Sequence, residues 1–212
     1  PALSGLGVTD VLAQPALKVL SGSKVIGSNT GWGTSPNSAP LASTAWRLGA
    51  FAWSTGSKDS AVLLTLDAGA YTFQVTGADG GTGVALLEIY IVTDSGLPGY
   101  LANLSSRGVS GSGDKVMISG FVTQGNTQVM VRGIGPSLAN LGVTGALTAP
   151  KLEVYTGTNL SDTVTAWGST FDPMAISSLF RKLGAFDLGA GSADSVDVLN
   201  INGARTAMVR ST

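Results

Sequence analysis

The chain has few of the residues that carry out acid–base, nucleophilic or metal chemistry. Its 212 residues include no histidine and no cysteine, which excludes a Ser-His-Asp triad, a Cys-His nucleophile and a zinc site built on those ligands. Glu88 and Glu153 are the only glutamates, and both lie in strand-like runs, so a catalytic carboxylate pair would need scattered aspartates. The sequence therefore predicts no catalytic residues, no metal site and no cofactor.

One carboxylate motif occurs twice. Asp59 and Asp194 each stand in Gly-Ser-x-Asp-Ser, directly before a strand-like run. We expect each aspartate to cap its own turn. Calcium binding is the alternative, but a hard cation needs several oxygens and each loop offers one carboxylate. The glycine-rich loop 78–83 has no helix behind it, so it predicts a tight connection and not an anion site.

The four tryptophans offer the main binding alternative. Trp32 and Trp167 each begin a Trp-Gly pair and predict a shared packing role, whereas Trp46 and Trp53 flank a Leu-Gly-Ala-Phe motif and have no such partners. For this second pair we favour a buried hydrophobic corner. A sugar-stacking platform or an interface anchor is the alternative.

An internal repeat sets the organisation of the chain. Residues 1–66 align with 136–201 without a gap and are identical at 24 of 66 positions, which indicates two copies of one unit. The second copy is preceded by strand-like residues in 101–135, and the first copy continues into 84–92. Neither extension has a counterpart in the other copy. One copy therefore lacks the beginning of the unit and the other lacks its end.

Composition limits the classes of partner. The chain is 43% hydrophobic and 12% charged, with a net charge of −1 and a pI near 5.2. It has no basic field for nucleic acid and no run near the roughly 18 apolar residues of a membrane helix. Low charge with abundant Gly, Ser and Thr leads us to expect an extracellular or cell-surface protein.

The hydrophobic pattern predicts strands almost throughout. Parallel α/β architecture is disfavoured because crossover helices are missing, and short strands with glycine-rich turns favour sandwiches. We expect an all-β fold of two tandem antiparallel β-sandwich repeats, Ig-like or jelly-roll-like, with at most one short helix each. The expected hairpins are 60–66 with 71–75, 115–122 with 127–131, and 196–201 with 205–209; further strands are 16–20, 84–92 and 151–155, and helices are 39–48 and 173–183.

Several motifs together resemble a known family. They are similar to a tandem β-rich repeat of very large secreted surface proteins of environmental bacteria, and 56–90 is the most specific part. The resemblance implies a structural or adhesive extracellular role and carries over no active-site residue. The matching segments are 132–138, 142–155, Trp167-Gly168, 183–186, 56–90 and 101–122.

These observations predict a first repeat over 1–95 without its N-terminal strands, a linker at 96–100, and a second repeat over 101–212 without its last strand. The expected function is a non-enzymatic subunit or repeat of a surface fibre or layer that assembles through β-strand edges. Its partners would be copies of itself or adjacent repeats. A carbohydrate-binding module or adhesin that uses Trp46 and Trp53 to bind polysaccharide is the alternative. The 212 residues could be a window on a longer repetitive chain, or a subunit completed by strands from neighbours.

The run 84–92 is the expected assembly interface. It is nearly all apolar, with Glu88 as its one charged residue, so we expect both of its faces to be covered. A two-layer sandwich covers only one face of a strand. The other face would then meet a second repeat or a neighbouring subunit. The candidate interface residues are Val84, Leu86, Leu87, Glu88, Ile89, Tyr90 and Ile91.

Overall fold

A computed structural model describes residues 1–92, 99–111 and 116–212. The chain divides into two compact units, Pro1–Asn103 and Leu104–Thr212, which we call unit 1 and unit 2. The fold is mostly β, with antiparallel sheets of three and four strands and few helices. This confirms the antiparallel, β-rich part of the predicted fold class. Most of the linker predicted at 96–100 lies outside the described residues.

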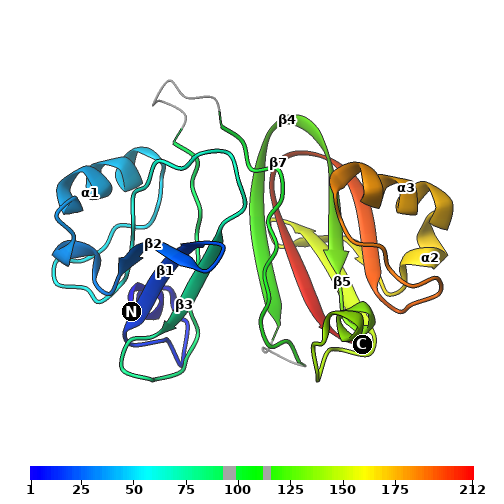
Figure 1. Cartoon of the computed structure of the whole chain (residues 1–212), viewed down its shortest axis with the longest axis horizontal. Coiled ribbons are helices and arrows are strands. Elements are labelled where there is room, and N and C mark those ends of the chain that lie inside the picture. The colour runs from blue at the N-terminus through cyan, green and yellow to red at the C-terminus, as the bar shows by residue number, and fades with distance from the viewer. Residues whose placement is uncertain (93–98, 112–115) are drawn as a thin grey trace. The chain divides into compact units, whose positions relative to one another are not determined.

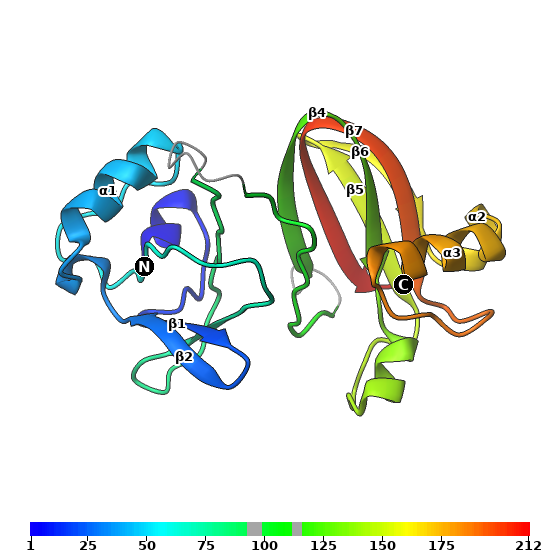
Figure 2. The ribbon, with the colours of Figure 1, turned by 45° about the horizontal axis from the view of Figure 1, so that its top comes forward.

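Unit 2 is built on a four-stranded sheet with the order β4-β7-β5-β6. Its two long strands, β4 and β7, pair antiparallel from Met117 opposite Val209 to Gly133 opposite Ser195, and they run side by side in both ribbon views (Figures 1 and 2). The strands are β4 (Met117–Gly133), β5 (Pro150–Thr156), β6 (Asn159–Val164) and β7 (Ser195–Ser211).

The two hairpins predicted within these long strands are wrong. Instead of turning back on itself, β4 continues through a register shift between Thr123 and Thr127. The opposite strand passes through Gly203 with a φ of 91°. Glycine at positive φ suits a tight turn, but it also permits a kink within a strand. Here β4 and β7 pair with each other on both sides of Gly203, so this glycine lies within a strand and not in a hairpin turn.

The helices of unit 2 cover a compact core beside the long strands. In α3 (Pro173–Leu183), Asp172 caps the N-terminus by accepting from the Met174 amide at 3.0 Å, and Gly184 ends the helix in a left-handed conformation. Ile176 and Phe180 lie one turn apart and are buried with Trp167, Leu188 and Val196. A single turn, α2 (Trp167–Thr170), is added to the one helix expected here, and η4 (Pro136–Leu141) follows β4.

Unit 1 has a three-stranded sheet with the order β2-β1-β3. Its helix α1 corresponds closely to the predicted helix 39–48. No helix in the described part of the chain is long and apolar enough to cross a membrane. The elements of unit 1 are η1 (Ala2–Leu6), β1 (Pro15–Ser21), β2 (Lys24–Asn29), η2 (Trp32–Thr34), α1 (Ser38–Arg47) and β3 (Thr72–Gly77).

The two sheets share one pairing register. Leu17 of β1 pairs with Val75 of β3, and Leu152, which stands 135 positions after Leu17, pairs with Val209 of β7. The pairs β1–β2 and β5–β6 also carry a bulge at corresponding positions. The order β2-β1-β3 therefore corresponds to β6-β5-β7. The sheet of unit 2 continues to β4, whereas no strand among the described residues flanks β3 on that side.

Two strands predicted in unit 1 do not form in the described structure. Residues 60–66 have no ladder partner, although the corresponding residues 195–201 pair with β4. Residues 84–92 contain only an isolated bridge from Val84 to Val11. Both predictions rested on apolar periodicity, but a strand also needs a neighbour to receive its backbone hydrogen bonds. Of the hairpin predicted from 60–66 and 71–75, only β3 is present.

Candidate functional site

The repeated aspartate holds a corner of the chain in unit 2. Asp194 is fully buried, and its Oδ1 accepts from the backbone amides of Gly135 at 2.7 Å and Ser137 at 3.4 Å. Its Oδ2 accepts from the hydroxyls of Ser137 and Ser192. Four donors thus surround one carboxylate. The arrangement ties the strand entering the corner to the loop before β7.

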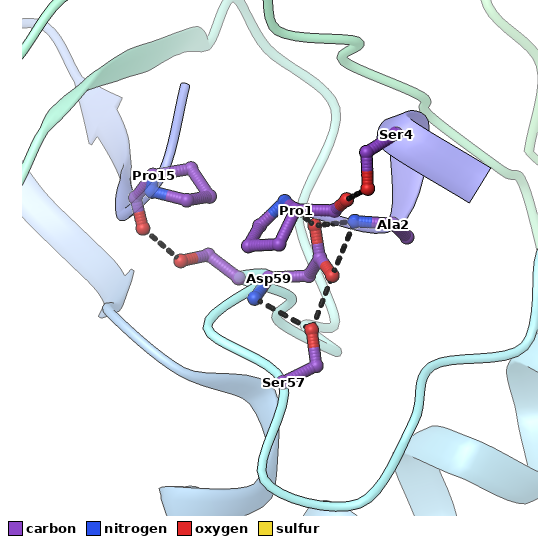
Figure 3. A network of polar contacts seen from close by, with 7 residues as sticks. Pro1, Ala2, Ser4, Pro15, Ser57 and Asp59 are labelled. Atoms are coloured by element: carbon purple, nitrogen blue, oxygen red, sulfur yellow. Dashed lines mark hydrogen bonds and ion pairs between the residues drawn. The ribbon is translucent and has the colours of Figure 1, made fainter. Parts of the chain in front are cut away.

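Asp59 holds the equivalent place in unit 1 (Figure 3). Its carboxylate lies 2.7 Å from the Pro1 ammonium group and accepts from the Ala2 amide and the Ser57 hydroxyl. Burial alone would raise the pKa of Asp59, but Pro1, Ser57 and Ala2 together lower that pKa below its ordinary value. The predicted turn cap is thus only part of its role, because Ala2 is 57 residues away in the sequence.

The geometry of these aspartates is that of structural clamps. Their oxygens are engaged by amide, hydroxyl and ammonium donors, which leaves little room for the several oxygen ligands of a hard cation. No group of three or more acidic, histidine or cysteine side chains suited to a metal ion occurs within the described residues. Asp79 lies apart in the glycine-rich loop and accepts from the Gly81 amide at 2.9 Å. That loop is tight, since a Cβ on Gly77 would lie 2.1 Å from the Gly81 carbonyl oxygen.

An aromatic hollow is the most site-like feature of unit 1. It encloses about 220 Å³, and it brings together the two tryptophans, Trp46 and Trp53, that the sequence singled out. Trp46 is 81% exposed, which differs from the buried corner that we favoured for it. The hollow is lined by Trp32, Ala42, Ala45, Trp46, Ala50, Phe51, Ala52 and Trp53.

The corresponding place in unit 2 is filled by a side chain from β4. There the Arg132 guanidinium stacks on the rings of Phe180 and Phe186, 4.5 Å from each ring centroid, and donates to the Phe186 carbonyl at 2.9 Å. Trp167 packs on Phe180 with centroids 5.9 Å apart. In unit 1 the counterpart of Trp167 is Trp32, and the ring that packs on it is that of Trp53.

The role of Arg132 was missed by sequence reasoning. Its motif, Arg-Gly-Ile-Gly-Pro-Ser-Leu, was noted only for family resemblance. The repeat offered a partial signal, because Phe186 recurs as Phe51 in the first copy. Arg132 can be recognised as the partner of these rings only once β4, which carries it, is placed beside α3.

The candidate interface run is extended and largely exposed. Val84 exchanges backbone hydrogen bonds with Asp10 and Leu12 at 2.7 and 2.8 Å. Beyond it, the Tyr90 hydroxyl donates to Glu88 at 3.0 Å, and Ile89 is half-buried. Both faces of the run carry exposed apolar side chains, so neither is covered within the described chain. The exposed hydrophobic members are Val84, Leu86, Leu87, Tyr90 and Ile91.

Comparisons with protein-family models, curated proteins and solved structures give no match to the chain. The functional argument therefore rests on the residues and contacts described above.

Proposed function

We propose that this protein is a non-enzymatic extracellular structural protein, the repeat unit or subunit of a surface fibre, filament or layer. It assembles through β-strand edges with other copies of itself or with adjacent repeats. The observation that carries this proposal is the presence of unpaired strand edges and an uncovered apolar run in a protein with few catalytic groups. Such edges are templates for another strand.

The edge of unit 2 is provided by β4. Within the described residues, β4 has a strand neighbour on one side only, β7. Two large apolar side chains on it are exposed, Ile118 at 57% and Val122 at 73%. A long edge strand with exposed apolar residues favours the addition of a further strand. Such an addition would extend the sheet of unit 2 by one strand beyond β4.

The run 84–91 in unit 1 is the second part of the proposed interface. It is extended, apolar and without a full ladder partner in the described chain. A contact between this run and the β4 edge of another copy joins unlike surfaces. Unlike surfaces propagate along an axis unless the rotation between subunits closes a ring. This favours a filament or layer over a two-fold dimer.

Concentration-dependent assembly tests the proposal. We expect the purified chain to form larger species in sedimentation velocity and ordered assemblies in electron micrographs as its concentration rises. Leu87→Asp should abolish these species, because it places a charge in the apolar run. Leu6→Asp is the matched control, since Leu6 is also an exposed leucine of unit 1. A strictly monomeric chain, or equal assembly of both variants, would remove the proposal.

Polysaccharide binding is the second candidate function, and the exposed indole of Trp46 at the aromatic hollow favours it. An exposed aromatic ring beside a hollow can stack on a sugar face. The test is retention on immobilised polysaccharides, with Trp46→Ala expected to abolish retention while leaving Tm unchanged. Tyr100→Ala is the control, because Tyr100 is similarly exposed and lies outside the hollow. Retention unaffected by Trp46→Ala would exclude the stacking platform.

A further inference from the structure

The free side of β3 in unit 1 corresponds to the side of β7 that pairs with β4 in unit 2. The strands β3 and β7 occupy the same position in their sheets and pair in the same register with β1 and β5. In unit 2 the other side of β7 pairs with β4 from Ser195 to Val209. In unit 1 no described strand covers the other side of β3. The repeat therefore shows what kind of strand this edge accommodates.

Side chains along this edge are exposed where their counterparts are buried. Ile201 in β7 is 1% exposed, and its counterpart Leu66 is 39% exposed. Leu63 and Leu64 are exposed as well, whereas Leu199 packs at the β4–β7 core. The local fold is otherwise preserved, because the Trp32 amide donates to the Asp59 carbonyl as the Trp167 amide donates to Asp194.

The aromatic hollow continues this edge. In unit 2 the same place receives Arg132 of β4. In unit 1 the exposed ring of Phe51, the counterpart of Phe186, and the Trp32–Trp53 pair line an open space. The buried indole N–H of Trp32 has no hydrogen-bond partner in the described part of the chain. Aromatic faces are favourable stacking surfaces for a guanidinium group.

Asp59 marks the position at which a strand docked like β4 would end. Asp194 binds the backbone of Gly135 and Ser137, the residues through which β4 runs into η4. Asp59 accepts from the Ala2 amide as Asp194 accepts from the Ser137 amide, and it also forms an ion pair with the Pro1 ammonium group. The end of a docked strand would thus lie beside Pro1, with its arginine three residues earlier over the hollow.

We propose that the free side of β3, residues 60–66 and the aromatic hollow form one receptor for a strand of the β4 type. The occupant is an extended segment with alternating apolar residues followed by Arg-Gly, as in Val-Met-Val-Arg-Gly. The chain's own β4 is not the donor, because it is paired with β7. The inference rests on the proposed function only for the biological source of that strand.

A peptide of residues 116–135 tests the receptor on the full chain. We expect saturable binding that changes tryptophan fluorescence, together with at least about tenfold slower amide hydrogen exchange in 61–66 and 72–76. A peptide with Arg132→Ala should bind about tenfold more weakly, because it loses the stacking and hydrogen bond of the guanidinium. A scrambled peptide is the matched control.

Several outcomes would overturn the receptor. Protection confined to 195–211 would show that the peptide displaces the chain's own β4. Protection of 61–66 without peptide at every chain concentration would show that this edge is already covered within the chain, and a fluorescence change with oligosaccharide but not with peptide would assign the hollow to sugars. The test of assembly is separate from the test of peptide binding. If the chain is monomeric but binds the peptide, the proposed function is removed and the receptor remains.

A fusion removes the difficulty that a free apolar peptide can aggregate. Residues 116–135 placed directly before Pro1 recreate the Gly135–Pro136 junction, because Pro1 aligns with Pro136. We expect the fused strand to protect 61–66 from exchange and to raise Tm. The same fusion with Arg132→Asp should lose most of this gain. A fused segment that exchanges freely would overturn the receptor geometry.

Discussion

Asp194 is the single residue on which the corner between β4 and the loop before β7 depends. Its carboxylate is buried and receives four hydrogen bonds. Asp194→Ala would leave buried donors unpaired, so we expect unit 2 to lose about 3–5 kcal/mol of unfolding free energy in urea titrations. Asp59→Ala is the matched control and should cost less, since its side chain is 16% exposed. Equal, small effects would contradict the clamp.

Asp197 predicts an unusual dependence of stability on pH. It is buried, and its Oδ2 has no hydrogen-bond partner within the described residues. Burial, and then the charge of Asp162, raise the pKa of Asp197. A raised pKa in the folded state means that the ionised carboxylate destabilises the fold above that pKa, and that the penalty disappears below the ordinary value of about 3.8.

Asp197→Asn should therefore raise Tm at pH 7 and lose this advantage near pH 3. The measurement is Tm against pH for the variant and the unmodified chain. Asp197→Val, which introduces the residue found at the corresponding Val62, should behave in the same way. A variant less stable than the unmodified chain at pH 7 would show that the ionised group is compensated.

Glu153 should produce a dependence of the opposite sign. The hydrogen bond from Lys151, whose ammonium group lies 2.7 Å from the carboxylate, has the largest effect on the pKa of Glu153 and lowers it. Burial raises this pKa, but Tyr155 and Arg210 lower it further, so the pKa lies below its ordinary value. Its stabilisation is present above the unfolded value of about 4.5 and is lost as pH falls through the folded pKa. We expect Glu153→Gln to lower Tm by a few degrees at pH 7 and to have little effect near pH 2. A constant difference across this range would contradict the ion-pair role.

At the scale of elements, the sequence predicts the bounds of a helix from local signals, but it does not predict which strands pair. The helix at 173–183 was predicted with its observed bounds because Pro173 at its start and Gly184 at its end are local signals. The Asn202-Gly203 pair favoured a hairpin turn with a positive φ at both residues, but among these two only Gly203 has one. Whether that φ makes a hairpin or a kink depends on β4, which lies about 80 residues away along the chain. Arg132 escaped notice for the same long-range reason.

The connection from β4 to η4 depends on a residue without a side chain. A Cβ on Gly135 would lie 2.1 Å from the Leu147 carbonyl oxygen, so Gly135→Ala must displace backbone. We expect a loss of more than about 3 kcal/mol in urea titrations. Gly142→Ala is the control: its φ is +76° but no atom lies within 4 Å of the added Cβ, so strain alone should cost about 1 kcal/mol. Similar losses would show that crowding is unimportant.

At the scale of the whole molecule, the two units differ in how completely their sheets are built. Unit 2 has four paired strands with a buried core, whereas unit 1 has three strands and an exposed edge at 60–66. We therefore expect unit 1 to unfold at a lower urea concentration than unit 2. Trp32, Trp46 and Trp53 lie in unit 1, and Trp167 alone lies in unit 2. Fluorescence consequently reports mainly on the weaker unit, while far-ultraviolet circular dichroism reports on both.

The fluorescence midpoint should thus fall below the dichroism midpoint in the same titration. Phe180→Ala provides the control, because Phe180 is buried in unit 2 and its truncation costs about 3–5 kcal/mol. This change should move the later part of the dichroism transition to lower urea and leave the fluorescence midpoint nearly in place. If both probes follow one transition in the unmodified chain, the two units unfold together. In that case the incomplete edge of unit 1 does not limit its stability.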